Sequence, residues 1–154
     1  MNIQELYVSA QGDREFREIA DAPEAATRYA DQEVIIHIAP GTYRERLVVH
    51  QDNISMIGED ASTTRITYSD GAFEVLADGE KRGTFRTPSF FIDADHFYAD
   101  NLTFCNEAGQ GDIAGQALAV YADGDHLVFE NCRLEGYQDT LFTAPLPKKE
   151  MQPG

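Results

Sequence analysis

The sequence of 154 residues has no tryptophan, only two cysteines and few basic side chains. Its 12 Lys and Arg residues stand against 27 Asp and Glu residues, and the resulting net charge of −15 would repel a phosphate backbone or an anionic lipid surface. No stretch approaches the ~18 consecutive apolar residues that a membrane-spanning helix needs. We therefore expect no nucleic acid and no membrane as partner. A polyuronic acid would bind better with its carboxyl groups esterified and neutral.

The two cysteines, Cys105 and Cys132, could form at most one disulfide bond. They do not fall at equivalent positions of the repeat described below, so we expect free, mostly buried thiols, which are typical of a reducing compartment. The first five residues show no basic segment followed by an apolar stretch. We therefore expect no secretory signal peptide in this sequence.

The chain length and a hydrophobic content of 42% are sufficient for one domain with a sizeable core, and too small for two. The first 33 residues differ from the rest. A strand at residues 6–9 precedes apolar residues with the spacing of a short amphipathic helix, which Pro23 should interrupt. We expect residues 1–33 to form an N-terminal cap, 34–144 to form the main body, and 145–154 to be a loop or a disordered tail.

From Val34 onward the hydrophobic pattern has a period of two, with Val34, Ile36 and Ile38 on one face until Pro40 and Gly41 end the run. Short polar turns separate further segments of this kind. The predicted strands are residues 34–38, 46–49, 54–57, 65–68, 89–92, 97–99, 102–104, 117–121, 127–129 and 132–134. Many short strands with almost no helix predict an all-β sandwich, barrel or solenoid.

An internal repeat favours one of these architectures. Residues 95–104 (DHFYADNLTF) align without gaps on residues 125–134 (DHLVFENCRL), a period of thirty, and residues 52–57 (DNISMI) resemble the start of the same unit. Such a period is typical of a parallel β-helix, in which each coil stacks on the previous one. Asn101 and Asn131 would then occupy one turn on successive coils, where their amides could hydrogen-bond. A β-sandwich with similar hairpins stays open as the alternative.

The motif with the clearest chemistry is GYQDTLF (residues 136–142), which sets the amide of Gln138 beside the carboxyl group of Asp139. An amide N–H can stabilise a developing oxyanion without adding a charge, and a tunable acid can protonate a leaving alcohol. The pair therefore predicts a site that cleaves esters. No Gly-x-Ser-x-Gly motif occurs, so nothing supports a serine nucleophile.

Five blocks resemble those of the pectinesterase family, the pectin methylesterases, which fold as right-handed parallel β-helices. In the family's order they are GTYRE (41–45), GTFRT (83–87), NLTFCNEAG (101–109), QALAV (116–120) and GYQDTLF (136–142), with the family's spacing of 22 between the two glutamines of the last two blocks. The resemblance covers roughly residues 34–144. It implies an all-β fold, a right-handed, pectin-lyase-like parallel β-helix that is incomplete and carries a short N-terminal helical cap.

The resemblance also implies a role for each matching residue. Asp139 would be the general acid that protonates departing methanol and then, as a base, activates the hydrolytic water. Gln138 would stabilise the negatively charged intermediate, and Gln116 would share that role. Thr84 and Gln116 would contact the substrate, methyl-esterified polygalacturonate (pectin, homogalacturonan). The family's chemistry uses no cofactor and no metal. Partial burial beside another carboxylate would keep Asp139 protonated near neutral pH.

The sequence departs from the family in one decisive respect. The family's nucleophile is a second aspartate on the next coil, followed by an arginine and a substrate-side tryptophan, and no block of this sequence resembles those regions. We therefore expect a truncated carbohydrate esterase of the aspartyl esterase type, with little or no activity by itself. The alternative is a non-catalytic β-helical remnant or a carbohydrate-binding module.

Other patterns do not define sites. His96 and His126 occupy matched repeat positions with no third recurring ligand, so we expect an exposed pair and no metal site. Asp93-Ala94-Asp95 and Asp123-Gly124-Asp125 are interpreted as solvated turns, because neither forms an EF-hand loop. The segment GQGDIAG (residues 109–115) has the wrong spacing for a phosphate loop.

A solenoid that ends in mid-stack leaves strand edges and apolar surface uncovered. We therefore expect residues after about Phe142 to be poorly ordered, and the chain to self-associate through the open end of the solenoid. The family is usually extracellular, whereas the absence of a signal peptide and the free thiols permit a cytoplasmic location. The sequence leaves the compartment open.

Overall fold

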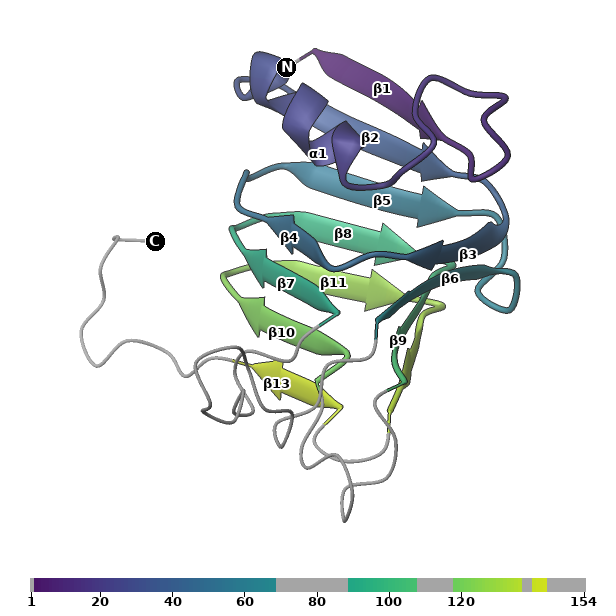
Figure 1. Cartoon of the computed structure of the whole chain (residues 1–154). Coiled ribbons are helices and arrows are strands. Elements are labelled where there is room, and N and C mark those ends of the chain that lie inside the picture. Colours follow the sequence, from purple (N-terminus) through teal and green to yellow (C-terminus); the bar gives the residue numbers. More distant parts are fainter. Residues whose placement is uncertain (1, 69–88, 108–117, 137–139, 144–154) are drawn as a thin grey trace, which may run out of the picture.

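The computed structural model describes residues 2–68, 89–107, 118–136 and 140–143, which form a stack of strands in three parallel sheets (Figure 1). Sheet A has the strand order β1 (Ile3–Val8), β2 (Glu33–Ile38), β5 (Ile54–Gly58), β8 (Phe97–Asp100) and β11 (Leu127–Glu130). Sheet B runs from β3 (Gly41–Arg44) through β6 (Thr64–Tyr68) and β9 (Thr103–Asn106) to β12 (Arg133–Glu135). Sheet C runs from β4 (Leu47–Val49) through β7 (Phe90–Asp93) and β10 (Val120–Asp123) to β13 (Leu141–Thr143).

Each coil contributes one strand to sheet A, then one to sheet B, then one to sheet C. The four coils are β2-β3-β4, β5-β6-β7, β8-β9-β10 and β11-β12-β13, and every pairing between the described strands is parallel. A sandwich of antiparallel hairpins is therefore excluded. The fold is a right-handed parallel β-helix, as the sequence predicts.

The strand register confirms the thirty-residue repeat. Phe97 pairs with Leu127 in sheet A, and Thr103 pairs with Arg133 in sheet B. Ile54 pairs with Phe97, so the segment at residues 52–57 is a third unit of the same repeat. Matched positions in the sequence are therefore neighbours in space, one coil apart.

The turns that lead into and out of sheet A use the left-handed region of backbone conformation. Asn53, His96 and His126 precede successive strands with φ of 62°, 57° and 57°. Asn101 and Asn131 follow two of these strands with φ of 57° and 50°, which confirms their shared turn position. Asparagine tolerates this region better than most residues because its short side chain can bond locally. The hydrogen bond that the structure records for the Asn131 amide goes to Asp100 Oδ1 at 3.0 Å rather than to Asn101.

The core is a column of inward-pointing side chains enclosed by the three sheets. Phe90, Phe97 and Phe104, one from each sheet, are almost completely buried. The ring centroid of Phe90 lies 5.5 Å from that of Phe97 and 4.9 Å from that of Phe104. Burying an aromatic side chain in this way contributes about 2–3 kcal/mol relative to leaving it exposed.

The N-terminal cap consists of α1 (Asp21–Ala26) and the 3₁₀ turn η1 (Thr27–Tyr29), at the β1 end of the stack (Figure 1). Ile19, Ala22 and Ala26 are fully buried as part of the core cluster. The prediction that Pro23 interrupts the helix is wrong, because Pro23 lies inside α1. It occupies the first turn, where a backbone N–H has no intrahelical acceptor to lose.

Two strands were not predicted. β3 contains a single inward apolar residue, Tyr43, and β13 overlaps the end of the GYQDTLF motif, whose residues we interpreted for their chemistry. A strand of three or four residues needs only one or two inward side chains in a solenoid, so period-two alternation is too short to detect. The strand predicted at 117–121 begins at Val120 instead. No described helix is long and apolar enough to cross a membrane.

Candidate functional site

The four predicted site residues lie outside the described residues. The structure does describe the strands that precede and follow them in the sequence. Thr84 falls between β6 and β7 in the sequence, Gln116 between β9 and β10, and Gln138 with Asp139 between β12 and β13. All four therefore belong to the connections from sheet B to sheet C, on three successive coils.

Backbone hydrogen bonds stack the points where these connections enter sheet C. Leu47 N donates to Ser89 O at 2.8 Å, and Phe90 N donates to Ala119 O at 2.9 Å. Ala119 N in turn donates to Thr140 O at 2.8 Å. Thr140 directly follows Asp139, and Ala119 follows Gln116 by three residues. The backbone that follows the predicted acid, Asp139, is thus hydrogen-bonded to the backbone that follows the predicted amide, Gln116.

The end of β9 in sheet B is hydrogen-bonded to residues that lead into sheet C. Asn106, the last residue of β9, is completely buried and donates from Nδ2 to Leu118 O at 3.0 Å. Ser89 Oγ donates to Cys105 O at 2.8 Å. Buried polar groups with partners of this kind hold backbone segments in one arrangement, since breaking the bond would leave a group unsatisfied.

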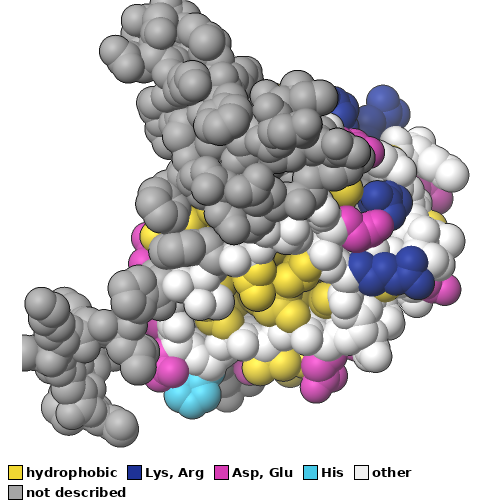
Figure 2. Space-filling model, turned by 90° about the horizontal axis from the view of Figure 1, so that it is seen from below, with side chains coloured by type: hydrophobic (Ala, Val, Ile, Leu, Met, Phe, Trp, Pro, Cys, Tyr) yellow, Lys and Arg dark blue, Asp and Glu magenta, His cyan; other side chains and the backbone are white. Residues whose placement is uncertain are grey.

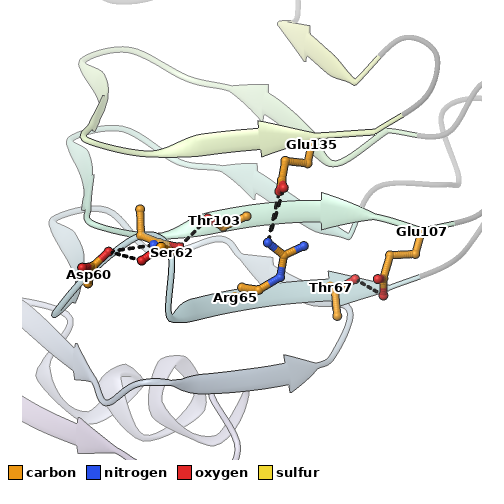
Figure 3. A network of polar contacts seen from close by, with 8 residues as sticks. Asp60, Ser62, Arg65, Thr67, Thr103, Glu107 and Glu135 are labelled. Atoms are coloured by element: carbon orange, nitrogen blue, oxygen red, sulfur yellow. Dashed lines mark hydrogen bonds and ion pairs between the residues drawn. The ribbon is translucent and has the colours of Figure 1, made fainter.

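A network of charged and hydroxyl groups covers the outer face of sheet B (Figure 3). Arg65 Nη1 on β6 reaches both carboxylate oxygens of Glu135 on β12, at 3.3 and 3.1 Å. Thr67 Oγ1 donates to Glu107 Oε2 at 2.7 Å, and Arg44 Nη1 lies 3.7 Å from the same oxygen. Charge-assisted bonds of this kind are stronger than neutral ones, although solvent exposure weakens them here.

The turn before β6 forms the other part of the network shown in Figure 3. Asp60 Oδ1 accepts from Ser62 N at 2.8 Å and from Ser62 Oγ at 2.7 Å, which lowers the pKa of Asp60. Thr103 Oγ1 donates to Ala61 O at 2.6 Å and so links this turn to β9 on the next coil. The start of β6 is held in place by local bonds.

The outer face of sheet C carries aromatic residues that sequence reasoning missed. Phe91 on β7 pairs with Tyr121 on β10. The rings of Phe91 and Tyr121 stack at a centroid distance of 4.7 Å, and His50 lies edge-on to Phe91 at 6.0 Å. The thirty-residue repeat could have revealed this pair, because Phe91 and Tyr121 are thirty residues apart in the sequence. An aromatic face of this kind can pack on an apolar ligand surface.

The cysteines and histidines form no metal site in the part of the chain that the structure describes. Cys105 is buried, Cys132 is partly buried, and they are not joined. Burial raises the pKa of both thiols, which makes them poor nucleophiles. The imidazoles of His96 and His126 stack at 4.9 Å in exposed turns. No group of three or more His, Cys, Asp or Glu side chains suited to a metal ion occurs among the described residues.

These features define the class of protein as a parallel β-helix with a polar edge where sheet B passes into sheet C. A family model for pectinesterase matches residues 5–146, so the chain belongs to the pectinesterase family.

Curated relatives agree with this assignment. Pectinesterase QRT1 of Arabidopsis thaliana is 43% identical over 117 residues, which are 72% of this chain and 31% of that protein. Pectinesterase 31 of the same plant is 30% identical over 143 residues, which are 89% of this chain and 44% of that protein.

Solved structures share the fold. A pectin methylesterase in complex with a hexasaccharide has a TM-score of 0.81 at 30% identity, covering 93% of this chain and 46% of that one. Pectin methylesterase PemA from Erwinia chrysanthemi has a TM-score of 0.80 at 29% identity, with the same coverage. The chain thus spans less than half the length of each of these relatives.

Proposed function

We propose that this chain contributes to the hydrolysis of methyl esters in pectin and carries the acid and the oxyanion-binding amides of that reaction. The main support is the strand topology: Thr84, Gln116 and the Gln138–Asp139 pair each fall in the sequence between a strand of sheet B and the next strand of sheet C, on three successive coils. Membership of the pectinesterase family supplies the reaction class. The substrate is methyl-esterified homogalacturonan, whose neutral residues suit a chain of net charge −15.

The roles follow from the chemistry of each group. Asp139 donates its proton to the departing methanol and then takes a proton from the water that cleaves the acyl intermediate. The amides of Gln138 and Gln116 donate hydrogen bonds to the oxyanion as it forms, and neither adds a charge. Thr84 contacts the polysaccharide, and the stacked pair Phe91 and Tyr121 offers an apolar surface for a sugar ring.

The nucleophile is the component without a candidate in these 154 residues. We infer that a polypeptide of these 154 residues by itself hydrolyses little or no ester, and that the nucleophilic aspartate and the arginine of the reaction have to be supplied by residues outside this sequence. A specific feature also favours the second candidate function, a carbohydrate-binding or remnant β-helix: the groups assigned here can bind an ester but cannot form the acyl intermediate.

The experiment measures methanol release from methyl-esterified polygalacturonate. We expect none from the 154-residue polypeptide, and measurable release after adding the C-terminal half of a homologous pectin methylesterase. Asp139→Asn should lower that release by at least 100-fold. The control Asp123→Asn changes an exposed carboxyl group at the end of β10 and should leave release unchanged.

Three outcomes would contradict the proposal. Methanol release from the 154-residue polypeptide alone would show that the site needs no further nucleophile. Binding of esterified pectin without release in the presence of the added half would favour the carbohydrate-binding module. Full release with Asp139→Asn would remove Asp139 from the mechanism.

We also propose that the 154-residue polypeptide self-associates through the last described coil. Among the described strands, β11, β12 and β13 each have a neighbour on one side only. Figure 2, which looks at this end of the stack, shows hydrophobic side chains gathered at its centre with charged groups around them. A hollow of about 380 Å³ is lined there by Ala122, Gly124, Leu127, Phe129, Leu134, Leu141 and Thr143. A second copy is the occupant we propose for this surface.

A further inference from the structure

Two acidic side chains lie where sheet B ends and the functional connections begin. Glu135 is the last residue of β12, and the next four residues include Gln138 and Asp139. Glu107 directly follows β9, on the connection that carries Gln116. Neither glutamate was singled out in the sequence, and both are held by residues of earlier coils (Figure 3).

Arg65 reaches Glu135 diagonally across the intervening coil. Arg65 is in register with Thr103 on β9, whereas Glu135 is in register with Cys105, two residues further along that strand. The two backbones are therefore two strand spacings apart, roughly 9–10 Å. A long side chain is needed to cover this distance, and Arg65 Nη1 reaches both carboxylate oxygens of Glu135, at 3.3 and 3.1 Å. Lysine would keep the positive charge but not the delocalised guanidinium group.

The other end of the same short connection is also held. Thr140 O accepts hydrogen bonds from Ala119 N at 2.8 Å and Val120 N at 3.2 Å. The described residues on both sides of positions 137–139 are therefore held, Glu135 through its side chain and Thr140 through its backbone oxygen. Glu107 is held in the same way, by Thr67 Oγ1 at 2.7 Å, Arg44 Nη1 at 3.7 Å and the backbone bond from its own N–H to Tyr68 O at 2.7 Å.

We propose that Arg65 is a positioning residue for the proposed active site: by holding Glu135 it fixes the sheet B end of the connection that contains Gln138 and Asp139. This inference rests on the proposed function for its catalytic meaning, although the contact itself does not. The side chains of Arg65 and Glu135 are 30% and 40% exposed, so their ion pair adds little to global stability. Its effect is local, because it restrains the end of β12.

The test compares Arg65→Gln with the parent in the 154-residue polypeptide, with no substrate present. We expect amide hydrogen exchange at Ala119 and Val120, whose N–H groups bond to Thr140 O, to become about threefold faster. The NMR signal of the Gln138 side-chain amide should shift. Arg65→Lys should give an intermediate effect, and the exchanged pair Arg65→Glu with Glu135→Arg should restore the parent behaviour.

Arg14→Gln is the matched control. Arg14 is 31% exposed and pairs at 3.3 Å with Glu59, the residue after β5, rather than with a residue of β12, so its loss should leave both readouts unchanged. Unchanged exchange at Ala119 and Val120 in Arg65→Gln would overturn the inference. An equal acceleration in β2 and β5 would also overturn it, because the role would then be general stability. The readouts need no catalysis, so failure of the esterase assay would contradict the proposed function and leave this result standing.

Discussion

Glu45 shows how one side chain holds the cap to the first coil. Its carboxylate oxygens accept hydrogen bonds from Ile19 N at 2.8 Å and Ala20 N at 2.9 Å, at the start of α1. Burial raises the pKa of Glu45 above its ordinary value of 4.5, and the bonds from Ala20 and Ile19 oppose that rise without cancelling it. The cap is therefore attached through a group whose charge is costly to bury.

The raised pKa predicts a pH dependence of stability. The folded state keeps the Glu45 proton to higher pH than the unfolded state, so the stability that Glu45 contributes is fully present below pH 4.5 and is lost as pH rises through the folded pKa. The free energy of unfolding of Glu45→Gln, relative to the parent, should therefore increase between about pH 4 and pH 7. Urea unfolding followed by circular dichroism at several pH values measures this slope.

Asp60→Asn provides a control of opposite sign. Hydrogen bonds from Ser62 lower the pKa of Asp60 below its ordinary value of 3.8, so its contribution is present above that pH and is lost as pH falls. The free energy of unfolding of Asp60→Asn, relative to the parent, should therefore decrease as pH rises through the acid range. Equal slopes for the two variants would contradict the account of Glu45.

At the scale of elements, the turns between sheet C and sheet A share a ladder of aspartates. Asp52 Oδ1 accepts from Asp95 N at 2.8 Å, and Asp95 Oδ1 accepts from Asp125 N at 2.8 Å. Each carboxylate thus satisfies the backbone N–H of the matching residue on the next coil. The same bond recurs along the stack because each repeat unit starts with an aspartate, at positions 52, 95 and 125.

Removing the middle member of the ladder tests its contribution. Asp95→Ala leaves Asp125 N without its acceptor and should lower the free energy of unfolding by about 1 kcal/mol. Asp95→Asn keeps an acceptor oxygen and should cost less. Asp123→Ala, at the exposed end of β10 just before the turn that contains Asp125, should change stability by no more than about 0.5 kcal/mol. Denaturant unfolding of the three variants checks this order, and equal losses for Asp95→Ala and Asp123→Ala would refute it.

At the scale of the whole molecule, the two ends of the stack differ. Residues of the cap, with Ile19, Ala22 and Ala26 fully buried, pack into the core at one end, whereas apolar side chains of the last described coil line an open hollow. A second copy therefore cannot stack head to tail through two matching open ends. Association through the hollow joins like surfaces and closes as a two-fold dimer.

Sedimentation of the 154-residue polypeptide over a range of concentrations tests this geometry. We expect a monomer–dimer equilibrium. Leu141→Asp places a charge at the hollow, where Leu141 is 49% exposed, and should weaken the dimer at least tenfold. Val48→Asp, at a site on β4 that is 46% exposed, should leave it unchanged. Larger open assemblies, or a monomer at every concentration, would contradict the proposal.

Local patterns predicted most of the fold. Alternation located the strands around Val34, Ile54 and Phe97, and the thirty-residue repeat predicted their register correctly. β3 escaped prediction because one inward residue makes no pattern. The candidate site residues came from motif resemblance, and Thr84, Gln116, Gln138 and Asp139 stay predictions because they lie outside the described residues.

The sequence by itself determined the repeating coil, the polar turns and the family, because each depends on residues close together in the chain or on blocks in a set order. Only the tertiary structure decided which residues meet across coils. Arg65 and Glu135 are 70 residues apart, and their contact depends on the exact stacking of β6, β9 and β12 and on the reach of one side chain. The stacking of Phe91 on Tyr121 depends in the same way on the closure of a whole coil, which no local pattern specifies.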